Sequence, residues 1–95
     1  MTDTDILRAL KTDLGLTTQA YDERLGQYIV SARKNISIEG IHLDADDIHD
    51  CNLVIQYAAW LWRKRIYGDG MPRMLRWELN QRLIHERLSE EDSES

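Results

Sequence analysis

Hydrophobic residues recur along most of the chain at intervals of three or four positions, which is the spacing of one face of an α-helix. A short series predicts a first helix that Thr4 caps and Gly15 ends. A longer series predicts a second helix, for which Thr17 or Thr18 offers an N-cap. The first series is Ile6, Leu7, Leu10 and Leu14, and the second is Tyr21, Leu25, Tyr28, Ile29, Ala32 and Ile36.

Two further helices are predicted in the second half of the chain. Asp46 or Asp47 caps a third helix that runs to about Tyr67, and its middle, 51–62, has no charged side chain. A helix that is apolar nearly all round belongs at the centre of a bundle. The segment 68–70 then ends the third helix, and a fourth helix extends from about Pro72 to Leu88. Its predicted hydrophobic side holds Met71, Met74, Leu75, Leu79, Leu83 and Leu88.

The segment between Ile36 and Asp47 departs from the helical period. Apolar and polar residues alternate around Glu39 and Gly40, which predicts a loop and leaves a small hairpin open. The apolar residues of this loop either fold back on the bundle, which we favour, or wait for strand addition by a neighbouring subunit. The residues concerned include Ile38, Ile41 and Leu43.

Together these elements predict an all-α fold, a four-helix antiparallel bundle-like domain with a longer loop between the second and third helices. The length of 95 residues fits one domain, which we place at 1–88. The segment 89–95 contains only Ser, Glu and Asp and is predicted to be disordered. No apolar run is long enough to cross a bilayer and the first residues are acidic, so we expect a cytosolic protein.

Charge is unevenly distributed along the chain. The net charge is -5, yet the segment 63–87 carries seven basic and three acidic side chains. The segments 1–50 and 89–95 are both acidic. The sequence therefore predicts one basic region between two acidic ends, an arrangement that suits contacts between copies of one chain.

The residues that carry catalysis or hold cofactors form no recognisable pattern. Cys51 is the single cysteine and lies in an apolar stretch, so we interpret it as part of the core. The acidic cluster 44–50 resembles a calcium loop but lacks its glycine and its final glutamate, and helix capping explains it better. We therefore expect no metal, no cofactor and no enzymatic activity.

Nucleic-acid binding is the main alternative function. Seven basic residues between Arg63 and Arg87 are able to contact phosphates, and Trp60, Trp62 and Trp77 are able to stack on bases. Trp60 and Trp62 lie two positions apart, so we expect at least one of them in the core. A regular apolar series in the last helix and an acidic tail argue against DNA reading. Arginine is also enriched in protein interfaces, and we favour protein binding over DNA binding as the role of this basic segment.

The order of these features resembles the tailed-phage head-to-tail connector family. The resemblance covers about residues 4–88 and rests on helix lengths and apolar spacing. The segments that carry it are Leu14-Gly15-Leu16-Thr17-Thr18 with Tyr21-Asp22-Glu23, Tyr28-Ile29 with Ala32 and Lys34, Tyr57-Ala58-Ala59-Trp60-Leu61-Trp62, and Tyr67-Gly68.

The resemblance implies a structural subunit in a ring of about a dozen copies beneath the portal protein. Such a ring completes the DNA-filled head and forms the platform for a downstream connector or the tail. DNA would pass through its channel without sequence-specific binding, and the protein would go from the host cytoplasm to the virion. Free subunits are either monomeric or assembled.

Two candidate contact regions follow from the resemblance. The last helix would dock on the portal or a neighbouring subunit, and the loop would contact the channel or the next ring. We further expect that reversing Arg76 and Arg82 to Glu leaves the fold intact and blocks assembly. The candidate interface residues are Arg73, Arg76, Arg82 and Arg87 in the helix and Ile38, Ile41 and Leu43 in the loop.

Overall fold

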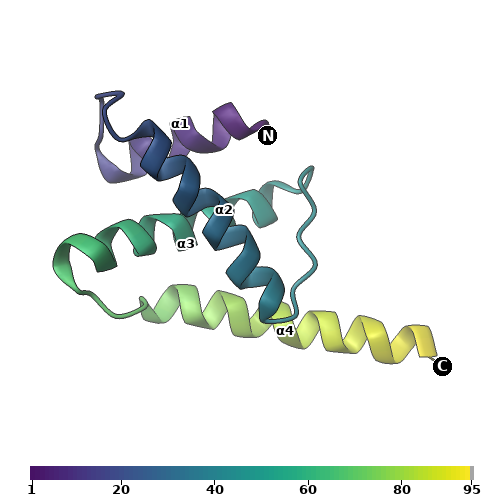
Figure 1. The fold of residues 1–95 in the computed structure, drawn as a ribbon. Helices are drawn as coiled ribbons and strands as arrows, with labels where there is room; N and C mark the ends of the chain where they lie inside the picture. Colours follow the sequence, from purple (N-terminus) through teal and green to yellow (C-terminus); the bar gives the residue numbers. More distant parts are fainter. Residues whose placement is uncertain (95) are drawn as a thin grey trace.

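The chain folds into four helices, as the sequence predicted. The computed structural model describes the backbone of residues 1–94 and the side chains of residues 1–89. Figure 1 shows α2 crossing α3 obliquely and α4 running antiparallel to α3 along the other side. The all-α prediction and the longer loop between the second and third helices are confirmed. The helices are α1 (Asp3–Leu14), α2 (Asp22–Ile38), α3 (Ile48–Tyr67) and α4 (Arg73–Glu94).

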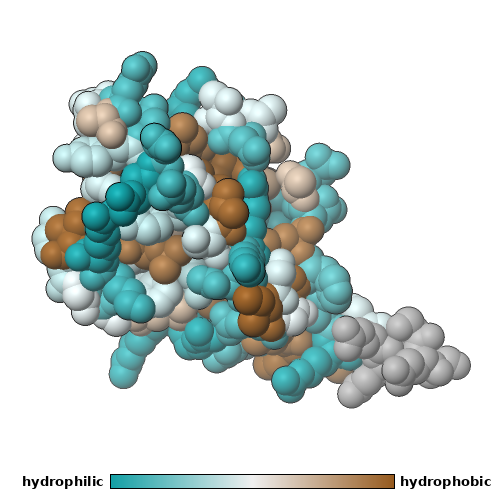
Figure 2. All heavy atoms as spheres, in the orientation of Figure 1, coloured by the Kyte–Doolittle hydropathy of each residue, from teal (hydrophilic) through white to brown (hydrophobic). Residues whose placement is uncertain are grey.

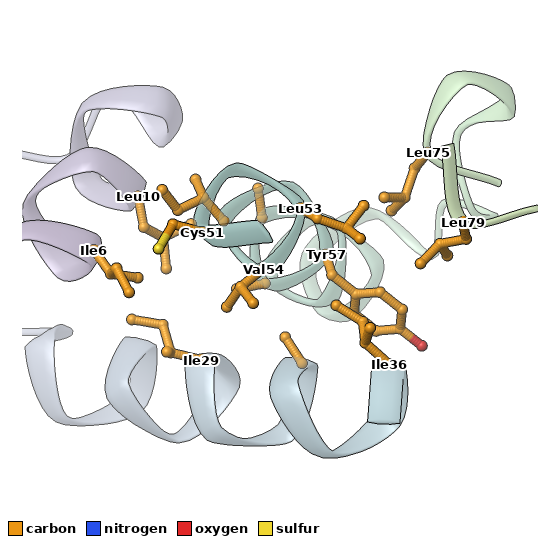
Figure 3. Close-up of a cluster of buried hydrophobic side chains, with 14 of the residues drawn as sticks. Ile6, Leu10, Ile29, Ile36, Cys51, Leu53, Val54, Tyr57, Leu75 and Leu79 are labelled. Carbon is orange, nitrogen blue, oxygen red and sulfur yellow. The ribbon is translucent and has the colours of Figure 1, made fainter. Parts of the chain in front are cut away.

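Helix α3 lies at the centre of the molecule, where it contacts α1, α2 and α4. Its uncharged middle is buried on nearly every side, which confirms the prediction from the sequence. Figure 3 shows Val54 directed toward α2 and Leu53 toward α4. The core is a single hydrophobic cluster that all four helices share. The four helices therefore form one unit, with α3 as the element that joins the others.

The N-cap of helix α1 lies two residues before the predicted one. Thr2, rather than Thr4, is the N-cap, and its hydroxyl accepts a hydrogen bond from the backbone N–H of Asp5 at 3.2 Å. The Asp5 carboxylate accepts one from the backbone N–H of Thr2 at 3.0 Å. This reciprocal pair satisfies two donors at once, which explains why the earlier threonine is used. Gly15 ends the helix with φ +71°, as predicted.

Helix α2 begins later than predicted. The hydroxyl of Thr18 accepts a hydrogen bond from the backbone N–H of Ala20 at 3.1 Å and thus stabilises a turn instead of capping the helix. Helical structure starts at Asp22, and Tyr21 at the N-cap makes no side-chain cap bond. The predicted hydrophobic face is confirmed except for Tyr21, which is 46% exposed. Its buried members are Leu25, Ile29, Ala32 and Ile36.

The loop between α2 and α3 contains no strand, and none occurs elsewhere in residues 1–94, so the hairpin alternative is wrong. Helix α2 continues to Ile38, two residues beyond Ile36, and Gly40 then turns the chain with φ +109°. That backbone conformation strongly favours glycine. A Cβ at this position would lie 3.5 Å from the side chain of Leu83 on α4. Gly40 therefore fixes how the loop leaves α2 and passes beside α4.

Helix α3 has the predicted cap and the predicted end, whereas α4 ends later than predicted. Asp47 caps α3, and Gly68 ends it with φ +71°. Helix α4 begins at Arg73 and continues to Glu94, six residues beyond the predicted end at Leu88 and into the segment predicted to be disordered. Neither glycine nor proline follows Leu88, and glutamate favours a helix. Only Ser95 of the predicted disordered tail lies outside the described backbone.

Candidate functional site

The loop residues predicted as contacts have different environments. Ile41 is only 2% exposed and belongs to the core, and Leu43 packs against that core. The favoured option, in which the loop folds back on the bundle, is therefore confirmed for these two residues. The side chain of Ile41 is not available to a partner in this conformation, and that of Leu43 is only partly exposed. Ile38 is 71% exposed at the end of α2 and remains accessible.

Arg82 was predicted to face a partner, but it lies against Asp50 of α3. Both terminal nitrogens of Arg82 donate to the Asp50 carboxylate, the Nη2–Oδ2 distance being 3.3 Å. Among the side chains of residues 1–89, Asp50 is the one charged residue that is buried, with 2% exposure. A carboxylate removed from water requires a cation or several donors, and Arg82 supplies both. Arg82 is thus a structural residue of this fold.

The same arginine holds the loop in place. Nη2 of Arg82 donates to the carbonyl oxygen of His42 at 2.9 Å, and Nε donates to Glu86 at 3.2 Å. Glu86 also accepts from the backbone N–H of His42 at 3.2 Å, and the Nδ1 atom of His42 lies 3.1 Å from it. The backbone N–H of Asp44 donates to Asp50 at 2.7 Å. We name this set, Asp50, Arg82, Glu86 and the backbone of 42–44, the loop clamp.

The loop clamp changes the acidity of two of its members. Hydrogen bonds from His42, supported by Arg82, lower the pKa of Glu86 below its ordinary value. Hydrogen bonding to Asp50 raises the pKa of Arg82 above its ordinary value. Both shifts favour the charged forms, so the clamp is held together by charges at neutral pH.

One signal for this clamp is present in the sequence but was not among the predictions. Asp50 lies one position before Cys51 and four before Val54, on the buried side of α3. An acidic residue on the buried side of a helix needs a basic partner. The identity of that partner, 32 positions away, depends on how α4 packs, which the pattern does not determine.

The remaining arginines of the last helix differ in their contacts. Arg76 donates to Glu39 at 2.7 Å, which joins α4 to the end of α2. Arg73 and Arg87 are exposed. The exposed part of the predicted interface therefore consists of Arg73, Arg87 and Ile38. Arg76 is exposed too, but it also forms the ion pair with Glu39.

Helix α4 has a second apolar face that the hydrophobic spacing did not separate from the first. Leu75 and Leu79 are buried against the bundle, but Met74 and Leu88, predicted on the same side, are exposed. Leu88 lies thirteen positions after Leu75, which at 3.6 residues per turn brings it far around the helix. Trp77 and Ile84 are exposed as well. We call this set the outer stripe: Met74, Trp77, Ile84 and Leu88.

A groove lies between the start of α2 and the end of α3. Trp62 lies beside Tyr21, with ring centroids 5.2 Å apart, and beside Tyr28 at 6.4 Å, both edge to face. The groove has a volume of about 570 Å³. We call it the aromatic groove. Its lining includes Tyr21, Arg24, Trp62, Arg65 and Ile66, together with Glu23.

The prediction for the tryptophan pair is corrected. Trp60 and Trp62 are both half-buried at the edge of the core rather than one being inside it. Trp60 packs edge to face on Tyr57 at 5.4 Å and donates to the carbonyl oxygen of Asp69 at 3.3 Å. Lys64 lies 5.1 Å from the centre of a Trp60 ring. Trp60 thus closes the turn after α3, while Trp62 lines the aromatic groove.

The acidic cluster before α3 is used for capping and turns. Asp47 accepts from the backbone N–H groups of His49 and Asp50, and Asp44 accepts from that of Asp46. Among the side chains of residues 1–89, no group of three or more His, Cys, Asp or Glu is placed to hold a metal ion.

The helices formed by residues 1–94 include none with the length and hydropathy needed to cross a membrane.

Comparisons of the chain with models of protein families, with curated proteins and with solved structures found no match. The function is therefore inferred from the outer stripe, from the aromatic groove and from the resemblance of the sequence pattern.

Proposed function

We propose that this protein is a structural subunit of a tailed-phage or prophage head-to-tail connector. In this proposal, copies of the chain form a ring of about a dozen subunits under the portal protein. The ring completes the DNA-filled head and provides the platform for a downstream connector or tail protein. The protein acts through protein contacts and carries out no chemistry.

The observation that carries the proposal is the outer stripe of α4. This helix has apolar side chains toward the core and others toward solvent, and Trp77 on the solvent side is 56% exposed. Figure 2 shows several hydrophobic residues reaching the surface of one face of the molecule. Large exposed apolar side chains on one helix favour a protein partner. The resemblance to the connector family adds what that partner would be.

The charge of the molecule supports a role beside packaged DNA. A net charge of -5 means that a channel built from many copies would on balance repel phosphates. DNA would pass without sequence-specific binding. Assembly would take place in the host cytoplasm, and the finished ring would lie at the head-to-tail junction of the virion.

The alternative of a DNA-binding or regulatory protein has less support. Two of its arginines, Arg76 and Arg82, form ion pairs within the chain, and Arg65 lies 3.3 Å from the hydroxyl of Tyr28. Fewer basic side chains are then available for phosphates. A salt-dependent shift of duplex DNA at physiological ionic strength would favour this alternative.

Electron microscopy of the purified chain mixed with its portal protein tests the proposal. We expect a ring of additional density on one face of the portal, with the same symmetry axis. A chain that never joins a portal or a phage particle, at any ratio tested, would contradict it.

A further inference from the structure

The outer stripe has the spacing of a helix-pairing seam. Met74, Trp77, Ile84 and Leu88 follow one another at intervals of three, seven and four positions, with Gln81 at the position between. Intervals that alternate between three and four keep side chains along one line of a helix that packs on another surface. The stripe lies away from the buried face formed by Leu75 and Leu79. It therefore has room for a partner that covers it lengthwise.

The second half of α4 projects from the bundle. Figure 1 shows the C-terminal end of α4 extending beyond the other helices, at one end of a molecule that is 51 Å long. Among the side chains of residues 1–89, Glu86 makes the last hydrogen bonds of this half with the loop. Ile84 and Leu88 are both about half exposed there. The chain continues with Glu90, Glu91, Asp92 and Glu94, so the projecting end is acidic.

The aromatic groove lies at the opposite end of the molecule. It is formed where α3 ends, and Figure 1 places that end away from the C-terminal end of α4. Tyr21 and Ile66 are about half exposed along it, and Trp62 lies between Tyr21 and Tyr28. Arg24 and Arg65 contribute two positive charges against the one negative charge of Glu23. The end of α3 adds Arg63 and Lys64 nearby in the chain.

The two ends thus differ in form and are opposite in charge. One presents the outer stripe of α4 with an acidic end, and the other presents a groove lined by aromatic and charged side chains with a net positive border. A contact between two different surfaces of identical subunits continues from copy to copy and closes into a ring when the rotation permits. A contact through one surface alone would stop at a dimer.

We infer that the projecting half of α4, with Ile84 and Leu88, docks in the aromatic groove of the next copy of this chain. Its acidic end lies beside Arg24 and Arg65 of that copy. This inference rests on the proposed function, since it specifies which surfaces join the subunits of the ring. It also replaces the assignment of Arg82 to that contact, because Arg82 is held in the loop clamp.

Mixing of two variants tests the inference. I84D/L88D damages the helix and keeps the groove, whereas I66D damages the groove and keeps the helix. Val30 is an exposed apolar residue on α2, so V30D is the matched control. R24E is a second groove variant that reverses a charge on an exposed residue and leaves the apolar packing in place. Circular dichroism verifies that each variant is folded.

Light scattering after size-exclusion chromatography then measures the oligomeric state of each variant, first alone at millimolar concentration and then mixed with the portal protein. We expect oligomers larger than a dimer for the unaltered chain and for V30D, and monomers for I84D/L88D, I66D and R24E separately. An equimolar mixture of I84D/L88D and I66D should give a dimer and nothing larger, because it retains one intact helix and one intact groove.

Several results would overturn the inference. They are an unaltered chain that stays monomeric at millimolar concentration, variants that assemble like the unaltered chain, or a mixture that does not pair. Variants that still self-assemble but no longer join the portal would assign the outer stripe to the portal instead. Rings on the portal that persist in all variants would remove this contact and leave the connector function standing. An unaltered chain that never joins a portal would remove the function itself.

Discussion

Among single residues, Arg82 and Asp50 form the polar contact on which the fold depends most. Arg82 is 27% exposed, whereas the Asp50 carboxylate is almost completely removed from water. Loss of one partner leaves an uncompensated buried charge, and this costs more than the pair itself contributes. The expectation that R76E/R82E leaves the fold intact is therefore replaced, since a glutamate at 82 would repel Asp50.

We predict that R82A lowers the free energy of unfolding by about 3–5 kcal/mol, because Asp50 then lacks its cation. Urea denaturation monitored by circular dichroism measures the change. R73A removes an exposed arginine of the same helix and should change stability by no more than about 0.5 kcal/mol. Equal effects of the two substitutions would show that the ion pair is not structural.

Glu86 predicts a pH dependence of stability. Its pKa is lowered in the folded chain, from an ordinary value of 4.5. Between that lowered pKa and 4.5, the unfolded chain binds a proton that the folded chain does not, so stability rises with pH. The contribution is present above 4.5 and disappears as the pH falls through the folded pKa. In E86Q this part of the rise should be missing from urea denaturation curves recorded across the acid range. An unchanged rise would exclude Glu86 as its source.

Among the helices and loops, the helices were predictable and several of their ends were not. Apolar spacing alone located the four helices, because one face of each must be buried. After α2, the positive φ of Gly40 turns the chain so that Ile41 enters the core, whereas Ile38 is exposed because it lies two positions after the buried Ile36, on the opposite side of the helix. The pattern treated Ile38 and Ile41 alike, since both are apolar and neighbours in a loop.

Substitutions of two glycines test this role of the loop. We predict that G40A destabilises the fold by roughly 1–2 kcal/mol, because an L-residue is strained at φ +109°. Gly26 lies within α2, and a Cβ there would meet nothing within 4 Å. G26A should therefore stabilise the fold by about 0.5–1 kcal/mol through its better helix propensity. Thermal unfolding distinguishes the two, and a G40A chain as stable as the unaltered one would contradict the role of Gly40.

Helix α4 shows why the candidate interface was only partly predictable. In the sequence, a helix with apolar residues on two sides has the pattern of one broad hydrophobic face. Only its packing on the other helices determines which side is buried. Packing on α3 covers Leu75 and Leu79 and leaves Trp77 exposed. The separation of an inner face from an outer stripe is thus a property of the tertiary structure.

Across the entire fold, the uneven charge of the sequence becomes a separation of acidic and basic residues in space. The acidic end of α4 and the basic end of α3 lie at opposite ends of an elongated fold (Figure 1). The sequence predicted a basic region between acidic ends. The structure adds that part of this region is used internally, by Arg76 and Arg82, and that part borders the aromatic groove.

Native mass spectrometry of the chain bound to its portal protein is the sharpest test of a connector function. We predict that the portal gains mass by a single whole-number multiple of the mass of this chain, which corresponds to a closed ring of about a dozen copies. A portal that gains no mass, or that gains a broad distribution of one or a few copies without a preferred number, would contradict the proposed function.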